Sequence, residues 1–210
     1  LQGGIPKLVL MAEFAADTDE EARQMAVAAE KTIQSFGLAT HITATQSEAN
    51  KFWTIRRESF KLLRENVSDK HTAPFIDDFV VRPEYLPEFL PRLYAILDEY
   101  NLLYTVAGHV GDGNFHIIPL MDFTRPDFVK IVNELSDRVY TLVGEYHGSI
   151  TGEHNDGLIR TPYLYKMFNP EILNVFQEIK EIFDPHRIFN PHKKVDPKIE
   201  YLHTAIKKHS

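Results

Sequence analysis

Apolar residues recur at helical spacing in several stretches of the chain, and each stretch predicts an α-helix with one buried face. The first helix is expected to begin at Thr18, which forms a capping box with Glu21, and to end near Gly37. The other predicted helices are residues 46–65, a helix that opens at Arg82-Pro83, residues 126–147, and a helix from Asn169-Pro170 through Phe183.

Shorter apolar runs predict β-strands, which are residues 7–14, 38–45, 78–81, 102–109 and 115–120. Residues 66–74 are polar and predict a loop. This order of strands and helices favours an α+β fold, in which an antiparallel sheet carries helices on one face in a ferredoxin-like arrangement. We expect residues 1–150 to form this ferredoxin-like domain and residues 151–210 to form a C-terminal helical segment.

Two histidines flank a strong turn signal in the second half of the chain. Between His109 and His116 lies the sequence Gly111-Asp112-Gly113-Asn114, which is typical of a turn between two strands. If these four residues form the loop, Val110 lies opposite Phe115, and His109 lies directly opposite His116. Such residues have Cβ atoms about 5 Å apart, so both imidazoles can bind one divalent cation. The alternative is that two histidines beside a turn only form hydrogen bonds.

A second polar cluster lies farther along the chain, at residues 151–157. Glu153 offers the carboxylate that would complete a set of three protein ligands and leave one position on the metal open. His154 would then lie beside the metal as an acid or a base. A Glu-His dipeptide alone is often a solvated surface feature, so this interpretation depends on the two histidines of the hairpin.

Composition and charge exclude several classes of function. The net charge of −7 argues against nucleic-acid binding, and no apolar run approaches the roughly 20 residues of a transmembrane helix. The absence of cysteine excludes disulfides, iron–sulfur ligation and thiol catalysis from this segment and fits a cytoplasmic location. The chain starts with Leu1-Gln2-Gly3-Gly4, without an initiator Met or a signal-peptide pattern, so we expect it to be a piece of a longer protein.

Four motifs in chain order carry a resemblance to a known family. They are residues 53–58 (Trp-Thr-Ile-Arg-Arg-Glu), 108–116 (Gly-His-Val-Gly-Asp-Gly-Asn-Phe-His), 152–154 (Gly-Glu-His), and Phe183-Asp184-Pro185 through Asn190-Pro191. In these motifs the chain resembles the FAD-linked oxidases and dehydrogenases of the vanillyl-alcohol-oxidase fold. Members of that family include D-lactate dehydrogenase, D-2-hydroxyglutarate dehydrogenase and the glycolate oxidase flavoprotein subunit. The resemblance extends from about the first predicted strand to Lys194.

The resemblance implies the C-terminal, substrate-binding cap of an FAD-dependent oxidoreductase. Such an enzyme oxidises a D-2-hydroxy acid, here of the lactate or glycolate type, to the 2-oxo acid by hydride transfer to the flavin. It implies that His109, His116 and Glu153 bind a divalent metal, zinc by analogy, which orients the substrate. It also implies that His154 is the catalytic base that takes the hydroxyl proton.

Other roles also follow from the resemblance. Arg56 or Arg57 would bind a substrate carboxylate, although a solvated helix face is an equal alternative for both. Asn190 would contact the cofactor, most of which is bound by an N-terminal FAD domain outside this chain. Residues 151–210 would pack toward that domain, without which the chain is expected to be inactive.

The chain departs from the family pattern at three places, one of which is the closing Asn-Pro-Gly-Lys motif, which here reads Asn190-Pro191-His192-Lys193. Asn155-Asp156 precede Gly157, a variant similar to large bacterial proteins that fuse the flavoprotein to an iron–sulfur region, so an iron–sulfur domain is the expected electron acceptor. Peripheral association with a membrane is compatible with such a protein. The substrate-contacting lysine of the 2-hydroxyglutarate enzymes has no counterpart near residues 76–78, which disfavours a dicarboxylate substrate.

Two functions of other classes remain open. In a metal-dependent hydrolase, the same two histidines and glutamate would activate a water molecule, with His154 as the base. In a non-catalytic binding module, the removal of His116 would leave turnover of the full-length protein unchanged.

Overall fold

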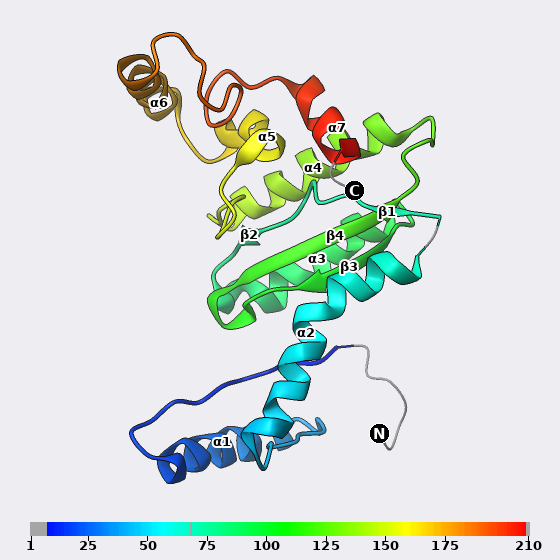
Figure 1. Cartoon of the computed structure of the whole chain (residues 1–210), viewed down its shortest axis with the longest axis vertical. Helices are drawn as coiled ribbons and strands as arrows, with labels where there is room; N and C mark the ends of the chain where they lie inside the picture. Colours follow the sequence, from blue (N-terminus) through cyan, green and yellow to red (C-terminus); the bar gives the residue numbers. More distant parts are fainter. Residues whose placement is uncertain (1–7, 68, 209–210) are drawn as a thin grey trace. The chain divides into compact units, whose positions relative to one another are not determined.

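A computed structural model describes residues 8–67 and 69–208 of the chain (Figure 1). The chain divides into two compact units, with the boundary between Leu62 and Leu63. The α-helices of the described residues are α1 (Asp19–Gln34), α2 (Gln46–Asn66), α3 (Leu86–Asp98), α4 (Phe128–Glu145), α5 (Gly157–Arg160), α6 (Pro170–Phe183) and α7 (Ile199–Lys208). The strands are β1 (His71–Thr72), β2 (Phe79–Val80), β3 (Leu103–Ala107) and β4 (Asn114–Met121).

The first unit contains α1 and the greater part of α2. The predicted capping box is confirmed, because the Thr18 side chain accepts the N–H of Glu21 at 3.2 Å and the Glu21 carboxylate accepts the N–H of Thr18 at 3.2 Å. The two strands predicted here are wrong. Residues 8–14 and 38–45 form no strand, and residue 7 lies outside the described residues. An apolar run becomes a strand only when another strand pairs with its backbone, and neither segment pairs with one among the described residues.

The second unit is built around β4, the central strand of an antiparallel sheet. All the other strands pair with β4: β3 along Leu103↔Leu120 to Ala107↔His116, β1 at its C-terminal end, and β2 at its N-terminal end. The predicted strands at residues 78–81, 102–109 and 115–120 are therefore confirmed, with slightly different ends. Residues 66–74, predicted as a loop, include β1 and the end of α2.

Helices α3 and α4 pack on this sheet and bury its apolar side chains (Figure 1). The largest fully buried side chains are Tyr140, Phe75, Phe79, Phe89, Phe128, Ile76, Leu93, Leu97, Ile117, Met121, Leu135 and Ile150. Side chains alternate along a strand, so Phe115 and Ile117 point to one face of β4, and Asn114 and His116 point to the other. The predicted α+β class, an antiparallel sheet with packed helices, is confirmed.

The C-terminal part of the chain is helical, as predicted. Helix α6 begins where the sequence indicated, because the Asn169 side chain accepts the N–H of Ile172 at 3.0 Å. The sequence did not predict α5, α7 or the 3₁₀ helix Thr161–Lys166. The expected division of the chain at residue 150 stays a prediction. None of the helices in the described residues is long and apolar enough to cross a membrane.

We expect the substitution Phe79→Ala to lower the free energy of unfolding of the chain by about 3–5 kcal/mol, because it leaves a cavity in the core. Phe79 is fully buried, with its ring centroid 5.7 Å from that of Phe89 and 5.9 Å from that of Phe115. Urea unfolding followed by circular dichroism measures the change. Phe183→Ala is the matched control, because Phe183 is 79% exposed and its loss should change the free energy by about 0.5 kcal/mol or less. Equal effects of the two substitutions would contradict this description of the core.

Candidate active site

The turn between β3 and β4 depends on two glycines. Gly113 has a φ angle of 71°, and a Cβ atom there would lie 1.7 Å from the carbonyl oxygen of Val81. Gly108 has a φ angle of 144°, and a Cβ atom there would lie 2.2 Å from the carbonyl oxygen of Asn114. These positions therefore accept only glycine, and they let the backbone of the turn pack closely against its neighbours.

The sequence predicted that the two histidines of this hairpin lie directly opposite each other, but in the structure they do not. His116 pairs with Ala107, two residues before His109. The expected register is wrong because the turn is longer than Gly111–Asn114. A 3₁₀ helix begins at Val110, and the carbonyl of His109 accepts the N–H groups of Asp112 at 2.9 Å and Asn114 at 3.2 Å. His109 therefore belongs to the turn and not to the strand.

The loop that carries Glu153 and His154 is held by one buried carboxylate. Asp78 accepts the backbone N–H groups of Gly152 at 3.1 Å, Glu153 at 3.0 Å and His154 at 2.8 Å. The Asn114 amide donates a fourth hydrogen bond to the same carboxylate at 3.1 Å. A Cβ atom at Gly152 would lie 2.8 Å from Asp78 Oδ1, so a larger residue would disturb this arrangement.

Asp78 remains charged despite its burial. Burial raises the pKa of its carboxyl group, but the backbone N–H donors and the guanidinium of Arg160 lower it more, and the pKa falls below its usual value. Arg160 Nη2 lies 3.5 Å from Asp78 Oδ2, and the same guanidinium donates to the carbonyl oxygens of Asp77 and Asn155. The carboxylate and the guanidinium together tie the loop to the start of β2.

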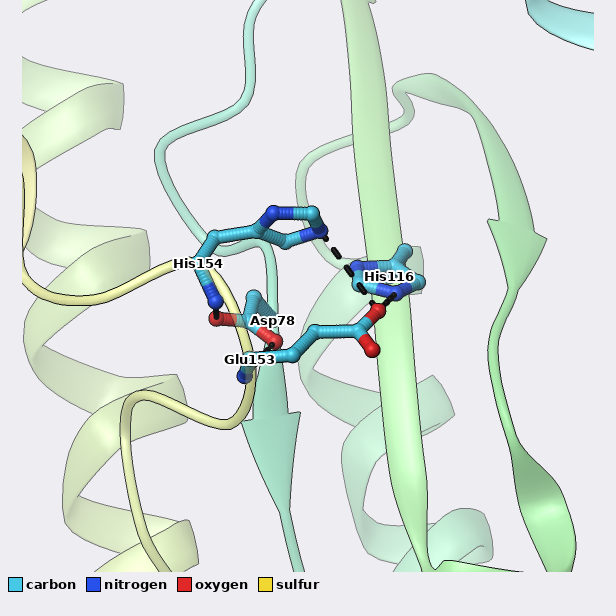
Figure 2. Close-up of side chains that lie close together, drawn as sticks. All are labelled: Asp78, His116, Glu153 and His154. Carbon is cyan, nitrogen blue, oxygen red and sulfur yellow. Dashed lines mark hydrogen bonds and ion pairs between the residues drawn. The ribbon is translucent and has the colours of Figure 1, made fainter.

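Three imidazoles lie near the carboxylate of Glu153, and two of them, those of His116 and His154, are drawn in Figure 2. His116 Nε2 lies 2.9 Å from Glu153 Oε1, His154 Nε2 lies 3.6 Å from the same oxygen, and His109 Nδ1 lies 3.6 Å from Oε2. We call these four residues, His109, His116, Glu153 and His154, the histidine–glutamate cluster. The structure thus brings together every residue that the sequence analysis assigned to the metal and to the catalytic base.

His116 also contacts a residue that the sequence analysis missed. Its Nδ1 lies 2.9 Å from Asp77 Oδ1, and this hydrogen bond is the main reason that the pKa of His116 is raised, against the opposing effect of burial. Asp77 lies just before the short strand β2, and a polar residue at the start of a strand usually has no functional role. No local pattern in the sequence connects it with His116.

The donor atoms of the histidine–glutamate cluster suit a divalent cation such as zinc, which binds imidazole nitrogen and carboxylate oxygen. Among the described residues, the donor atoms of Asp78, His116, Glu153 and His154 lie within 4.8 Å of one another, whereas His109 is outside this group and approaches only Glu153, at 3.6 Å. However, both oxygens of Asp78 already accept backbone N–H groups, so it is suited to support the loop and not to bind a metal.

The other predicted site residues belong to other segments of the chain. Arg56 is half-buried and Arg57 is exposed on α2, in the first unit of the chain. Asn190 is exposed in the turn that follows α6, with a φ angle of 44°, and its amide oxygen accepts a hydrogen bond from Lys193 Nζ at 3.2 Å. The roles of these three residues stay predictions.

We expect Asp78→Asn to lower the free energy of unfolding by on the order of 3 kcal/mol, because it replaces a buried charged acceptor of several N–H groups. Because the pKa of Asp78 is lowered from 3.8 in the folded chain, its stabilising effect is present above that pH and is lost as the pH falls below it. The difference between wild type and variant should therefore shrink below about pH 3.8. Urea unfolding at a series of pH values measures it, with Asp112→Asn, at an exposed position, as the control. If the difference in the free energy of unfolding between wild type and Asp78→Asn did not depend on pH, the ionised Asp78 carboxylate would not be what stabilises the loop.

Known proteins resemble this chain over most of its length. Residues 6–194 match the family described as FAD linked oxidases, C-terminal domain. D-2-hydroxyglutarate dehydrogenase of Haemophilus influenzae is 34% identical over 147 residues, which make up 70% of this chain and 14% of that protein. The enzyme of the same name from Pseudomonas putida is 35% identical over 158 residues, which are 75% of this chain and 16% of that protein. Glycolate oxidase subunit GlcD of Escherichia coli K12 is 29% identical over 159 residues, 75% of this chain and 31% of that protein.

The chain therefore spans only a small part of the length of the curated relatives that it matches. The family match includes the turn, the loop at residues 152–154 and all four residues of the histidine–glutamate cluster. Because this match covers nearly the whole sequence, the chain belongs to the FAD-linked oxidases and corresponds to their C-terminal domain.

Proposed function

We propose that this chain is the substrate-binding part of an FAD-dependent oxidoreductase that converts a D-2-hydroxy acid to the 2-oxo acid. One observation carries the proposal: three imidazoles from two segments of the chain, the hairpin and the loop, lie near the carboxylate of Glu153 in a member of the FAD-linked oxidase family. Such a cluster can bind an anionic, hydroxylated substrate through a cation and can accept a proton beside it.

His109, His116 and Glu153 would hold a divalent metal, with zinc as the first candidate. Bound there, the metal would supply a positive charge that binds the carboxylate and the hydroxyl group of the substrate. The exposure of the side chains supports this assignment: that of His116 is 10% exposed, whereas those of Glu153 and His109 are 44% and 53% exposed. The cluster is thus closed on the side of His116 and accessible on the other.

His154 is the proposed base for the hydroxyl proton. Its imidazole is 58% exposed, and its ring centroid lies 5.0 Å from that of His116. Its backbone N–H is fixed by Asp78, so the loop presents the ring from a defined position while the ring itself stays accessible to a substrate. FAD, when bound, would supply the hydride acceptor, and Asn190 is the residue of this chain proposed to contact it.

Helix α6 supports the proposal that residues 151–210 pack toward the FAD domain. A group of apolar side chains on α6 and in the following turn is exposed in this chain: Ile172, Val175, Ile179, Ile182, Phe183, Ile188 and Phe189. Exposed apolar surface of this kind is typical of an interaction site. An iron–sulfur domain in the same polypeptide remains the proposed electron acceptor.

We propose that Arg56 or Arg57 binds a substrate carboxylate and so helps to select the 2-hydroxy acid. The sequence near residues 76–78 favours a monocarboxylate of the lactate or glycolate type. Several relatives are named D-2-hydroxyglutarate dehydrogenase, which makes that dicarboxylate the necessary comparison. The ratio of kcat/KM for D-lactate, glycolate and D-2-hydroxyglutarate will decide between the two classes.

The test uses the full-length protein. We expect it to be yellow, to reduce an artificial electron-accepting dye with a D-2-hydroxy acid, and to lose this activity on chelation of its metal and regain it with zinc. His154→Asn should lower kcat by about 10²–10⁴-fold, the usual contribution of a general base. His147→Asn is the matched control, because His147 is exposed and asparagine tolerates its positive φ angle of 52°. A colourless protein with metal-dependent esterase activity would instead indicate a hydrolase.

The proposed contact of α6 predicts that one substitution has different effects in two contexts. Ile182 is 73% exposed, so Ile182→Ser should change the free energy of unfolding of the chain alone by about 0.5 kcal/mol or less. In the full-length protein it should cost about 2 kcal/mol, because the FAD domain would bury the side chain. Val129→Ser on α4 is the control, since Val129 is 44% exposed and should show the same small effect in both contexts. The same small effect of Ile182→Ser in both would rule out this contact.

A further inference from the structure

His116 lies between two carboxylates, one on each ring nitrogen. Its Nδ1 is 2.9 Å from Asp77 Oδ1, and its Nε2 is 2.9 Å from Glu153 Oε1. The two carboxylates differ in accessibility, because the side chain of Asp77 is 18% exposed and that of Glu153 is 44% exposed. Asp77 is therefore on the closed side of the imidazole, and Glu153 is on the side that is accessible to a cation and a substrate.

The two ring nitrogens consequently have different tasks. A neutral imidazole carries one N–H and one lone pair, and a carboxylate can only accept a hydrogen bond. In the neutral tautomer whose Nδ1–H donates to Asp77, the lone pair of His116 is on Nε2, and a cation between Nε2 and Glu153 would replace the proton that the 2.9 Å hydrogen bond between these two groups requires. This is the nitrogen that can bind a cation together with the Glu153 carboxylate.

The backbone around Asp77 is held in place from two directions. Arg160 Nη1 donates to the carbonyl oxygen of Asp77 at 2.8 Å, and the next residue, Asp78, accepts the N–H groups of the Glu153 loop. Asp77 thus belongs to the same short segment whose next residue, Asp78, positions Glu153. Its carboxylate can fix the orientation of the His116 ring relative to Glu153, because both are anchored to one short segment.

We propose that Asp77 is a positioning residue that orients His116 for metal binding. Asp77 would bind the Nδ1–H of His116, and Nε2 of the same ring would bind the metal. This inference rests on the proposed metal site and adds to it a residue that does not touch the metal. A carboxylate on the far nitrogen of a metal-binding histidine fixes its tautomer and its orientation, and its loss typically weakens metal binding by about 10–100-fold.

The test measures the binding of zinc to the full-length protein. Equilibrium dialysis against zinc buffers, with the bound metal quantified by atomic emission, gives the affinity of wild type and variants. We expect Asp77→Ala to weaken binding by about 10–100-fold and Asp77→Asn, which keeps the shape and an acceptor oxygen, to weaken it less. Asp112→Ala is the control for the loss of one nearby negative charge, because Asp112 is an exposed residue of the turn, and it should leave the affinity unchanged.

A second readout separates orientation of the ring from general stability. Cobalt(II) loaded into the same proteins reports the geometry of the ligands, and we expect its visible absorption spectrum to change in Asp77→Ala and to be partly restored in Asp77→Asn. Zinc affinity and a cobalt spectrum equal to wild type in both Asp77 variants would overturn the inference, even if their unfolding temperatures fall.

Two further variants distinguish failure of this inference from failure of the proposed metal site. His109→Ala and His116→Ala should each weaken zinc binding strongly if the site is as proposed. If they weaken it and the Asp77 variants do not, the metal site stands and the role of Asp77 is excluded. If His109→Ala and His116→Ala both bind zinc like wild type, the metal site itself is wrong, and the inference fails with it.

Discussion

The buried carboxylate of Asp78 is the interaction on which the rest of the site depends. It accepts the N–H groups of three consecutive residues, Gly152 to His154, and no part of its side chain is exposed to solvent. A carboxylate removed from water is costly unless donors surround it, and backbone N–H groups in a tight loop are equally costly without an acceptor. Here the N–H groups of the loop stabilise the buried carboxylate, and the carboxylate accepts their hydrogen bonds. The loop that carries Glu153 and His154 therefore has one favoured position against β2.

This constraint explains how residues from three distant segments form one cluster. The first segment enters β2 with Asp77 and Asp78, the second is the turn and β4 with His109 and His116, and the third is the loop with Glu153 and His154. Asn114 connects the first two, because it pairs with Val80 in the sheet and donates its side-chain amide to Asp78. Arg160 connects the first and the third through the carbonyl oxygens of Asp77 and Asn155.

The sequence predicted the members of the cluster better than their geometry. The helices, the hairpin, the two histidines and the Glu-His pair follow from local patterns, because periodicity, turn chemistry and metal-ligand residue types can be seen within a few positions. The register of the hairpin could not be predicted, since it depends on the 3₁₀ turn at Val110 and on close approaches of Gly108 and Gly113 to distant backbone. Asp77 and Asp78 were missed for the same reason, because their partners are far away in the sequence. Residues 8–14 show the reverse error, an apolar run without a partner strand.

The distribution of exposure in the cluster distinguishes a closed side from an open side. The His116 side chain is 10% exposed, with Asp77 behind it, whereas Glu153, His109 and His154 are each about half exposed. A site that excludes water strengthens the electrostatic interactions with a bound substrate, and open imidazoles and a solvated carboxylate do not provide such a site. Within the second unit, the described residues supply the closed side. Under the proposed function, the substrate and an FAD domain would cover this open side, and the flavin would reach the substrate from there.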